Sequence, residues 1–100
     1  MTVAAWDSER QPLDQVHARL HEAGVEPGPD GYDVAALNAA IASRGLMPAT
    51  IEGGPEEYKA VLAMTTGTVA SRSAVGYGAR PEDALARALD AYIRYMAPGA

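Results

Sequence analysis

Few residues in this chain are of the right type and spacing to do chemistry together, and the sharpest set lies near the N-terminus. Asp14, His17 and His21 are spaced i, i+3 and i+7, so on a helix they would share one stripe. Two histidines one turn apart can chelate a divalent metal, with a carboxylate as third ligand. No fourth ligand is evident nearby, so we interpret this set as a solvated polar flank and predict neither metal nor cofactor. Paired histidines could also make such a helix pH-sensitive.

Two further motifs carry weaker chemical signals. Glu56-Glu57 has the composition of a catalytic carboxylate pair, but adjacent acids in a loop are more often a solubilising surface. Gly76 and Gly78 precede a predicted helix, as in a phosphate-binding loop, yet the parallel βαβ setting of such loops is missing. With no cysteine and only two histidines, the sequence predicts that the protein is not an enzyme.

The charge of the chain is unevenly distributed. Its formal net charge is −5 over 100 residues. Residues 1–33 hold seven acids and two arginines, so the whole excess lies there, and the remainder is balanced. Such a chain has no positive excess to attract polyanions, which disfavours a protein that grips nucleic acid through phosphates. No segment has the roughly 20 apolar residues of a membrane span, and no signal peptide is visible. We expect a cytoplasmic protein without a membrane partner.

Residue patterns predict three helices and three strands. Pro12 suits a first helical turn, Asp33 is a good N-cap, and Gly24 and Gly45 can end helices in the left-handed conformation. Apolar residues recurring every 3.6 positions predict the lengths of the helices, and apolar residues alternating every 2 positions predict the strands. The predicted helices cover residues 12–23, 34–44 and 81–96, and the predicted strands cover 47–52, 58–65 and 69–77.

The last helix has both an apolar stripe and two predicted ion pairs. Asp83 with Arg87, and Asp90 with Arg94, are spaced i,i+4 in the favourable order, with the acid nearer the N-terminus. Tyr58, Tyr77 and Tyr92 fall on the apolar stripes of their elements, so we expect them in the core.

Short turns between successive strands predict an antiparallel meander that needs cover on its apolar face. The predicted fold class is therefore α+β: a two-layer sandwich of a three-stranded antiparallel sheet packed by two helices (α-β-β-β-α), with an extra N-terminal helix. The Pro- and Gly-rich loop before residue 32 divides an acidic helical extension, residues 1–31, from the main body, residues 32–100, within one globular unit.

This element order resembles the double-stranded-RNA-binding domain over residues 33–97. The matching pieces are Leu37-Asn38, Arg44-Gly45-Leu46, Gly76-Tyr77-Gly78 and the alanine-rich last helix. The resemblance implies RNA contacts from the first helix, from a His-containing loop between the first two strands, and from a basic cluster opening the last helix.

The residues at those three places depart from the family pattern. The helix offers Asn38 and Ser43, the loop reads Gly53-Gly54-Pro55-Glu56-Glu57, and the last helix opens with Arg80-Pro81-Glu82-Asp83. No RNA-binding residue is therefore carried over. The alternative of a divergent nucleic-acid-binding domain would depend on the arginines of the main body, Arg44, Arg72, Arg80 and Arg87.

The run from Gly78 to Leu89 also resembles the last helix of small bacterial and phage α/β sandwich proteins, some of which are accessory factors or inhibitors. We therefore expect a non-enzymatic protein–protein interaction module that binds a basic partner surface, such as a phage or mobile-element inhibitor of the anti-CRISPR type. The candidate interaction residues are Trp6, Asp7, Glu9, Asp14, Glu22 and Tyr95. A self-associating assembly protein, for example a homodimer joined at an open sheet edge, is the third alternative.

Overall fold

The computed structural model describes residues 12–46, 48–54, 56–66 and 69–96, and for residues 63–66, 69–73, 95 and 96 it describes the backbone alone. The elements follow the order α1 (Leu13–Glu22), α2 (Val34–Ser43), β1 (Thr50–Gly53), β2 (Tyr58–Thr66), β3 (Val69–Gly78) and α3 (Pro81–Ala91), which continues as the π-helical segment η2 (Tyr92–Met96). The predicted α+β fold class is confirmed. None of the helices in these ranges is long and apolar enough to cross a membrane.

The local signals act as expected at the helix ends. The Asp33 carboxylate accepts a hydrogen bond from the Ala36 amide at 2.9 Å and so caps α2. Gly24 and Gly45 follow α1 and α2 with φ values of 91° and 74°, which glycine adopts at little cost. Pro81 occupies the first turn of α3.

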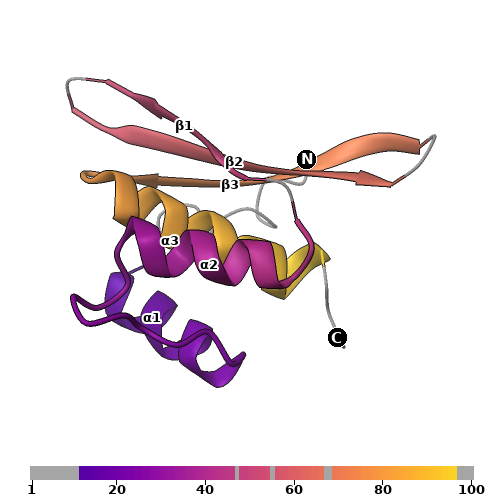
Figure 1. The fold of residues 1–100 in the computed structure, drawn as a ribbon. Helices are drawn as coiled ribbons and strands as arrows, with labels where there is room; N and C mark the ends of the chain where they lie inside the picture. Colours follow the sequence, from indigo (N-terminus) through magenta and orange to yellow (C-terminus); the bar gives the residue numbers. More distant parts are fainter. Residues whose placement is uncertain (1–11, 47, 55, 67–68, 97–100) are drawn as a thin grey trace.

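The sheet is an antiparallel meander in the order β1-β2-β3. Ala60 and Leu62 of β2 pair with Gly76 and Ala74 of β3, and these four residues turn towards the helices and are buried. Figure 1 shows all three helices on that side of the sheet, with α1 farthest from it.

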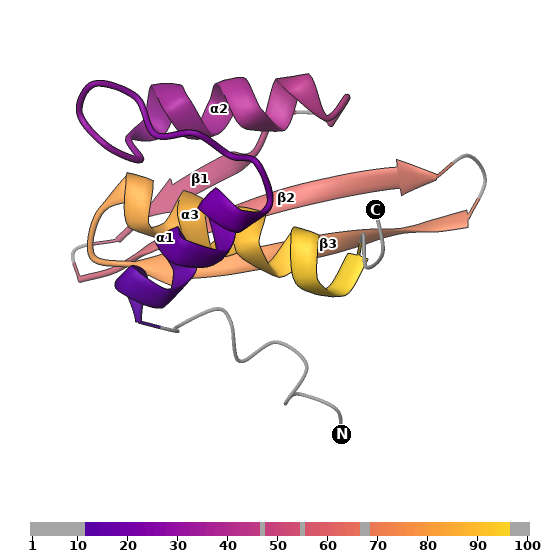
Figure 2. The same cartoon turned by 90° about the horizontal axis from the view of Figure 1, so that it is seen from below.

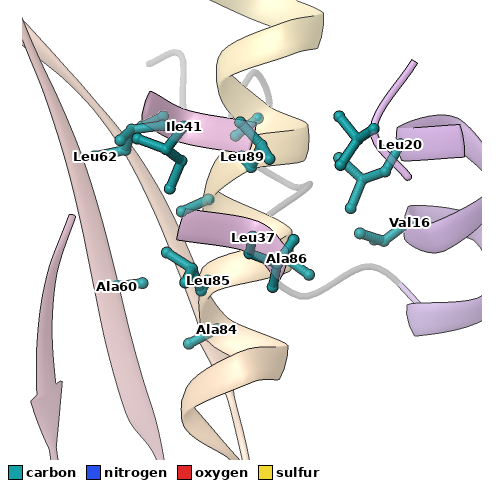
Figure 3. Packing of buried hydrophobic residues seen from close by; sticks show 14 residues of the cluster. Val16, Leu20, Leu37, Ile41, Ala60, Leu62, Ala84, Leu85, Ala86 and Leu89 are labelled. Atoms are coloured by element: carbon teal, nitrogen blue, oxygen red, sulfur yellow. The ribbon is translucent and has the colours of Figure 1, made fainter. Parts of the chain in front are cut away.

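Helix α3 lies at the centre of the molecule. It packs on the sheet with one face, while α1 and α2 cover its other sides (Figures 2 and 3). Its buried residues are Asp83, Ala84, Leu85, Ala86, Ala88, Leu89, Asp90 and Ala91. Half of these are alanines, whose small side chains let three elements approach one helix closely. Val16 and Leu20 of α1 also belong to the buried core, so α1 adds to the core that the sheet and α3 form.

Two glycines of β3 permit the close approach of α3. A Cβ atom on Gly76 would overlap the Ala84 carbonyl oxygen and the Ala88 amide nitrogen. On Gly78 it would lie 2.6 Å from the Asp83 Cβ and 2.7 Å from the Ala84 nitrogen. These neighbours are mostly backbone atoms, which cannot turn aside as a flexible side chain can. The Gly76-Tyr77-Gly78 stretch is therefore a packing motif.

Three sequence expectations need correction. β1 begins at Thr50, not at residue 47, and Pro48 is exposed outside the strand. Tyr77 pairs with Lys59 on the sheet face turned away from the helices, so it is not the core residue we expected, whereas Tyr58 and Tyr92 do pack against the core.

The glycine contacts predict a steep cost for adding one methyl group at residue 76. We expect Gly76→Ala to lower the free energy of unfolding by about 1–3 kcal/mol or more, since α3 must move off the sheet. Gly28→Ala is the matched control, because a Cβ there meets nothing nearer than 3.5 Å. Urea unfolding followed by circular dichroism measures both. Equal stabilities for the two variants would contradict the packing role of Gly76.

Candidate interaction surface

A buried ion pair fastens α1 to α3. The Arg19 guanidinium donates to both carboxylate oxygens of Asp90, from Nε at 3.0 Å and from Nη2 at 2.9 Å. The Asp90 side chain is 1% exposed and the Arg19 side chain 28%. Arg94 approaches the same carboxylate at 3.9 Å. This two-pronged geometry is the strongest way for an arginine to hold a carboxylate, so it fixes the position of α1 on the core.

The same ion pair leaves the outer surface of residues 12–33 acidic. Arg19 is the only lysine or arginine in this segment, and Asp90 from the last helix takes up its charge. Four carboxylates of the segment are exposed: Asp14, Glu22, Glu26 and Asp30. The exposed Arg44, which contacts the Ala23 carbonyl, offsets part of this charge, and the negative potential that remains extends about 8 Å into physiological salt. We call these four side chains the acidic surface.

Two of the predicted interaction residues, Asp14 and Glu22, are part of the acidic surface. Trp6, Asp7 and Glu9 lie outside the described residues, and of Tyr95 only the backbone is described. Their part in binding stays a prediction.

The metal-binding alternative finds no geometric support. Within the ranges that the structure describes, no group of three or more His, Cys, Asp or Glu side chains could hold a metal ion, so Asp14, His17 and His21 form no such site. His17 instead packs on the Tyr32 ring, with centroids 4.9 Å apart and planes inclined by 37°.

Tyr32 ties the loop that follows α1 back onto that helix. Its hydroxyl donates to the Val25 carbonyl at 2.6 Å, and its ring meets His17. Burial, and then the nearby charge of Glu26, raise the pKa of Tyr32 above its usual value. The phenol is therefore kept protonated and able to donate.

Three arginines of the nucleic-acid alternative have contacts within this chain. Arg80 is ringed by carboxylates, lying 3.3 Å from Glu82 and 3.2 Å from Asp83, which raise its pKa. Arg87 donates to the Tyr77 carbonyl at 2.7 Å. Arg44 donates to the Ala23 carbonyl at 3.1 Å, which links the ends of α1 and α2. Only the backbone of Arg72 is described.

Two open hollows flank α2, but neither has reactive chemistry. One, of about 320 Å³, is lined by Asn38, Ile41, Ala42, Leu46 and Pro48. The other, of about 250 Å³, includes Glu26, Ser43 and Arg44, and the Ser43 hydroxyl donates to the Ala40 carbonyl of its own helix. Neither wall offers a nucleophile beside a base. Glu56 and Glu57 are exposed in the turn between β1 and β2.

Sequence reasoning missed Arg19 and Asp90. The predicted pair of Asp90 with Arg94 is present at 3.9 Å, but the hydrogen bonds of Asp90 come from Arg19. Asp83 was assigned to Arg87 and instead pairs with Arg80. The missed signal was that Arg19 falls between Val16 and Leu20 on the apolar stripe of α1, where a charge must find a partner.

Comparisons with known proteins assign no relative to this chain. No protein-family model matches it, and neither a curated protein nor a solved structure matches it significantly. The likeness to the double-stranded-RNA-binding domain therefore stays a prediction.

Removing the buried carboxylate should loosen α1. Asp90→Ala leaves Arg19 without its main partner, so we expect it to lower the free energy of unfolding by about 3–5 kcal/mol. The control is Glu22→Ala, which removes an exposed acid from α1, the helix that carries Arg19. It should change the free energy of unfolding by less than about 0.5 kcal/mol. Chemical denaturation compares the two. The double variant Arg19→Leu, Asp90→Leu should recover much of the loss. A small effect of Asp90→Ala would contradict the anchoring role.

At high pH the ionisation of Tyr32 should lower the stability of the protein. Since its folded-state pKa is raised, the phenol contributes its full stability below pH about 10, and that contribution is lost as pH rises from there towards the raised pKa. Tyr32→Phe should be less stable at pH 7 by about 0.5–1.5 kcal/mol, through loss of the hydrogen bond to Val25. This difference should shrink above pH 10. Thermal melts of both proteins from pH 7 to 11 measure it, and a constant difference would contradict this role.

Proposed function

We propose that this protein is a non-enzymatic protein–protein interaction module whose acidic surface binds a basic patch on a partner. The observation that carries the proposal is that Asp14, Glu22, Glu26 and Asp30 are all exposed, whereas Arg19, the one lysine or arginine of residues 12–33, is paired with Asp90. Complementary charge of this kind steers association and selects partners.

The arginine contacts support a protein partner over nucleic acid. Arg44, Arg80 and Arg87 each contact a carbonyl or a carboxylate of this chain. Phosphate binding would have to compete with these contacts, and with the negative charges beside Arg80. An inhibitor that occupies the basic surface of a nucleic-acid-handling complex fits this charge distribution.

Charge reversal on the acidic surface tests this function. The triple variant Asp14→Lys, Glu22→Lys, Glu26→Lys keeps the core side chains, which truncation would not, because α1 carries Val16 and Leu20. We expect this variant to lose at least tenfold in affinity for the partner captured from a host lysate and identified by mass spectrometry.

The matched control reverses three exposed acids elsewhere, Glu52→Lys, Glu56→Lys and Glu57→Lys, which lie on β1 and the turn after it. It should retain the partner. Equal capture by both variants would contradict the assignment of the acidic surface, and a tight, salt-sensitive gel shift with double-stranded RNA would favour the nucleic-acid alternative.

A further inference from the structure

The two edges of the sheet are very different. β1 is four residues long, contains the exposed Glu52 and leads into Glu56 and Glu57. β3, on the opposite margin in Figure 2, is ten residues long and contains one charged residue, Arg72, and no lysine or proline. Short length and charge protect edges from pairing with other chains. β1 has both protections, whereas β3 has almost none.

The hairpin between β1 and β2 fixes which backbone groups of β3 point outward. The Gly54 amide donates to the Glu57 carbonyl at 2.9 Å, which makes this a hydrogen-bonded pair. Pairs alternate along an antiparallel ladder, so Glu52 and Lys59, two steps on, are also hydrogen-bonded. Lys59 thus directs its backbone groups towards β1. Its partner Tyr77 must therefore direct its own backbone groups away from β2, to the outer edge of β3.

A side chain confirms this direction. Arg87 reaches round from α3 and donates to the Tyr77 carbonyl at 2.7 Å. By the same alternation Val75 and Ser73 also direct their N–H and C=O groups outward. In the part of the chain that the structure describes, no hydrogen bond to the outward groups of Ser73 and Val75 is found. Arg87 therefore caps one end of the edge, and the stretch around Ala74 is left open.

We propose that this open stretch of β3 pairs antiparallel with β3 of a second copy, so that the two sheets join into one of six strands. The row of outward N–H and C=O groups is complementary to itself when two copies meet about a two-fold axis near Ala74. Ser73 of one protomer then faces Val75 of its partner, and Arg87 marks where the pairing ends. A strand satisfies such an edge through main-chain hydrogen bonds.

The charges favour a second copy as the occupant. Each protomer has a net charge of −5, so the repulsion between two copies is weakest where carboxylates are few. β3 itself has no acidic residue, while the other edge has Glu52 and the turn beyond it has Glu56 and Glu57. The strand of a second copy also matches the edge in length. This pairing uses a different surface from the proposed function and does not depend on it.

The test is a proline on the open edge. Val75→Pro removes an outward N–H that β2 does not use, and proline is tolerated on edge strands in that orientation. Val61→Lys is the matched control: it places a charge on the uncovered sheet face, opposite Val75 on the central strand, without touching the edge. Sedimentation equilibrium over a range of concentrations should give twice the monomer mass for the wild type and Val61→Lys, and the monomer mass for Val75→Pro.

Amide exchange of the wild-type protein gives an independent readout that needs no variant to fold. The amides of Ser73 and Val75 should exchange at least tenfold more slowly at high protein concentration than at low concentration. The proposal would be overturned by a monomer mass at every concentration, or by amide exchange rates of Ser73 and Val75 that do not depend on protein concentration. A dimer that Val61→Lys breaks and Val75→Pro leaves intact would also overturn it, since the sheet face would then be the interface. The charge-reversed acidic surface should leave the dimer unchanged.

Discussion

The close contact between α3 and β3 is the constraint on which the rest of the molecule depends. Gly76 and Gly78 let the helix backbone lie where any side chain would collide with it. A helix held that near the sheet needs small residues, and the alanines of α3 provide them on every side. Small residues in turn let α1 and α2 pack on the same helix. With no phenylalanine in the chain, the core is built by short distances between elements more than by large side chains.

The same constraint decides which surfaces are left for binding. Most of α3 is buried, and at its start, which stays partly exposed, the side chains of Arg80 and Glu82 pair with each other. Its first turn is occupied by an internal cluster in which Arg80 contacts Glu82 and Asp83. Among the described residues, the surfaces that remain for binding are the outer side of α1, the surface of α2, the sheet face turned away from the helices, and the sheet edges.

Much of the fold could be predicted from the sequence, because local signals and core packing agree. The spacing of Leu37 and Ile41 behind the Asp33 cap defines α2, and the structure differs there by one residue. Local sequence signals failed where contacts between distant residues determine the structure. The pairing of Thr50 with Val61 sets the start of β1, and no local pattern encodes it. The hydrogen-bond partner of Asp90 lies 71 residues away in sequence, so the helical i,i+4 rule found Arg94, 3.9 Å from the carboxylate, but not Arg19.

The charge distribution links the two surfaces. Arg19 is withdrawn from the acidic side by Asp90, and the carboxylates that remain lie on α1, on the loop after it and on the β1 side of the sheet. Negative charge on those surfaces keeps copies of an acidic protein apart there, yet attracts a basic partner. β3 has no carboxylate to repel another copy. One asymmetric arrangement of acids therefore separates the surface proposed to bind a basic protein from the edge proposed to pair with an identical chain.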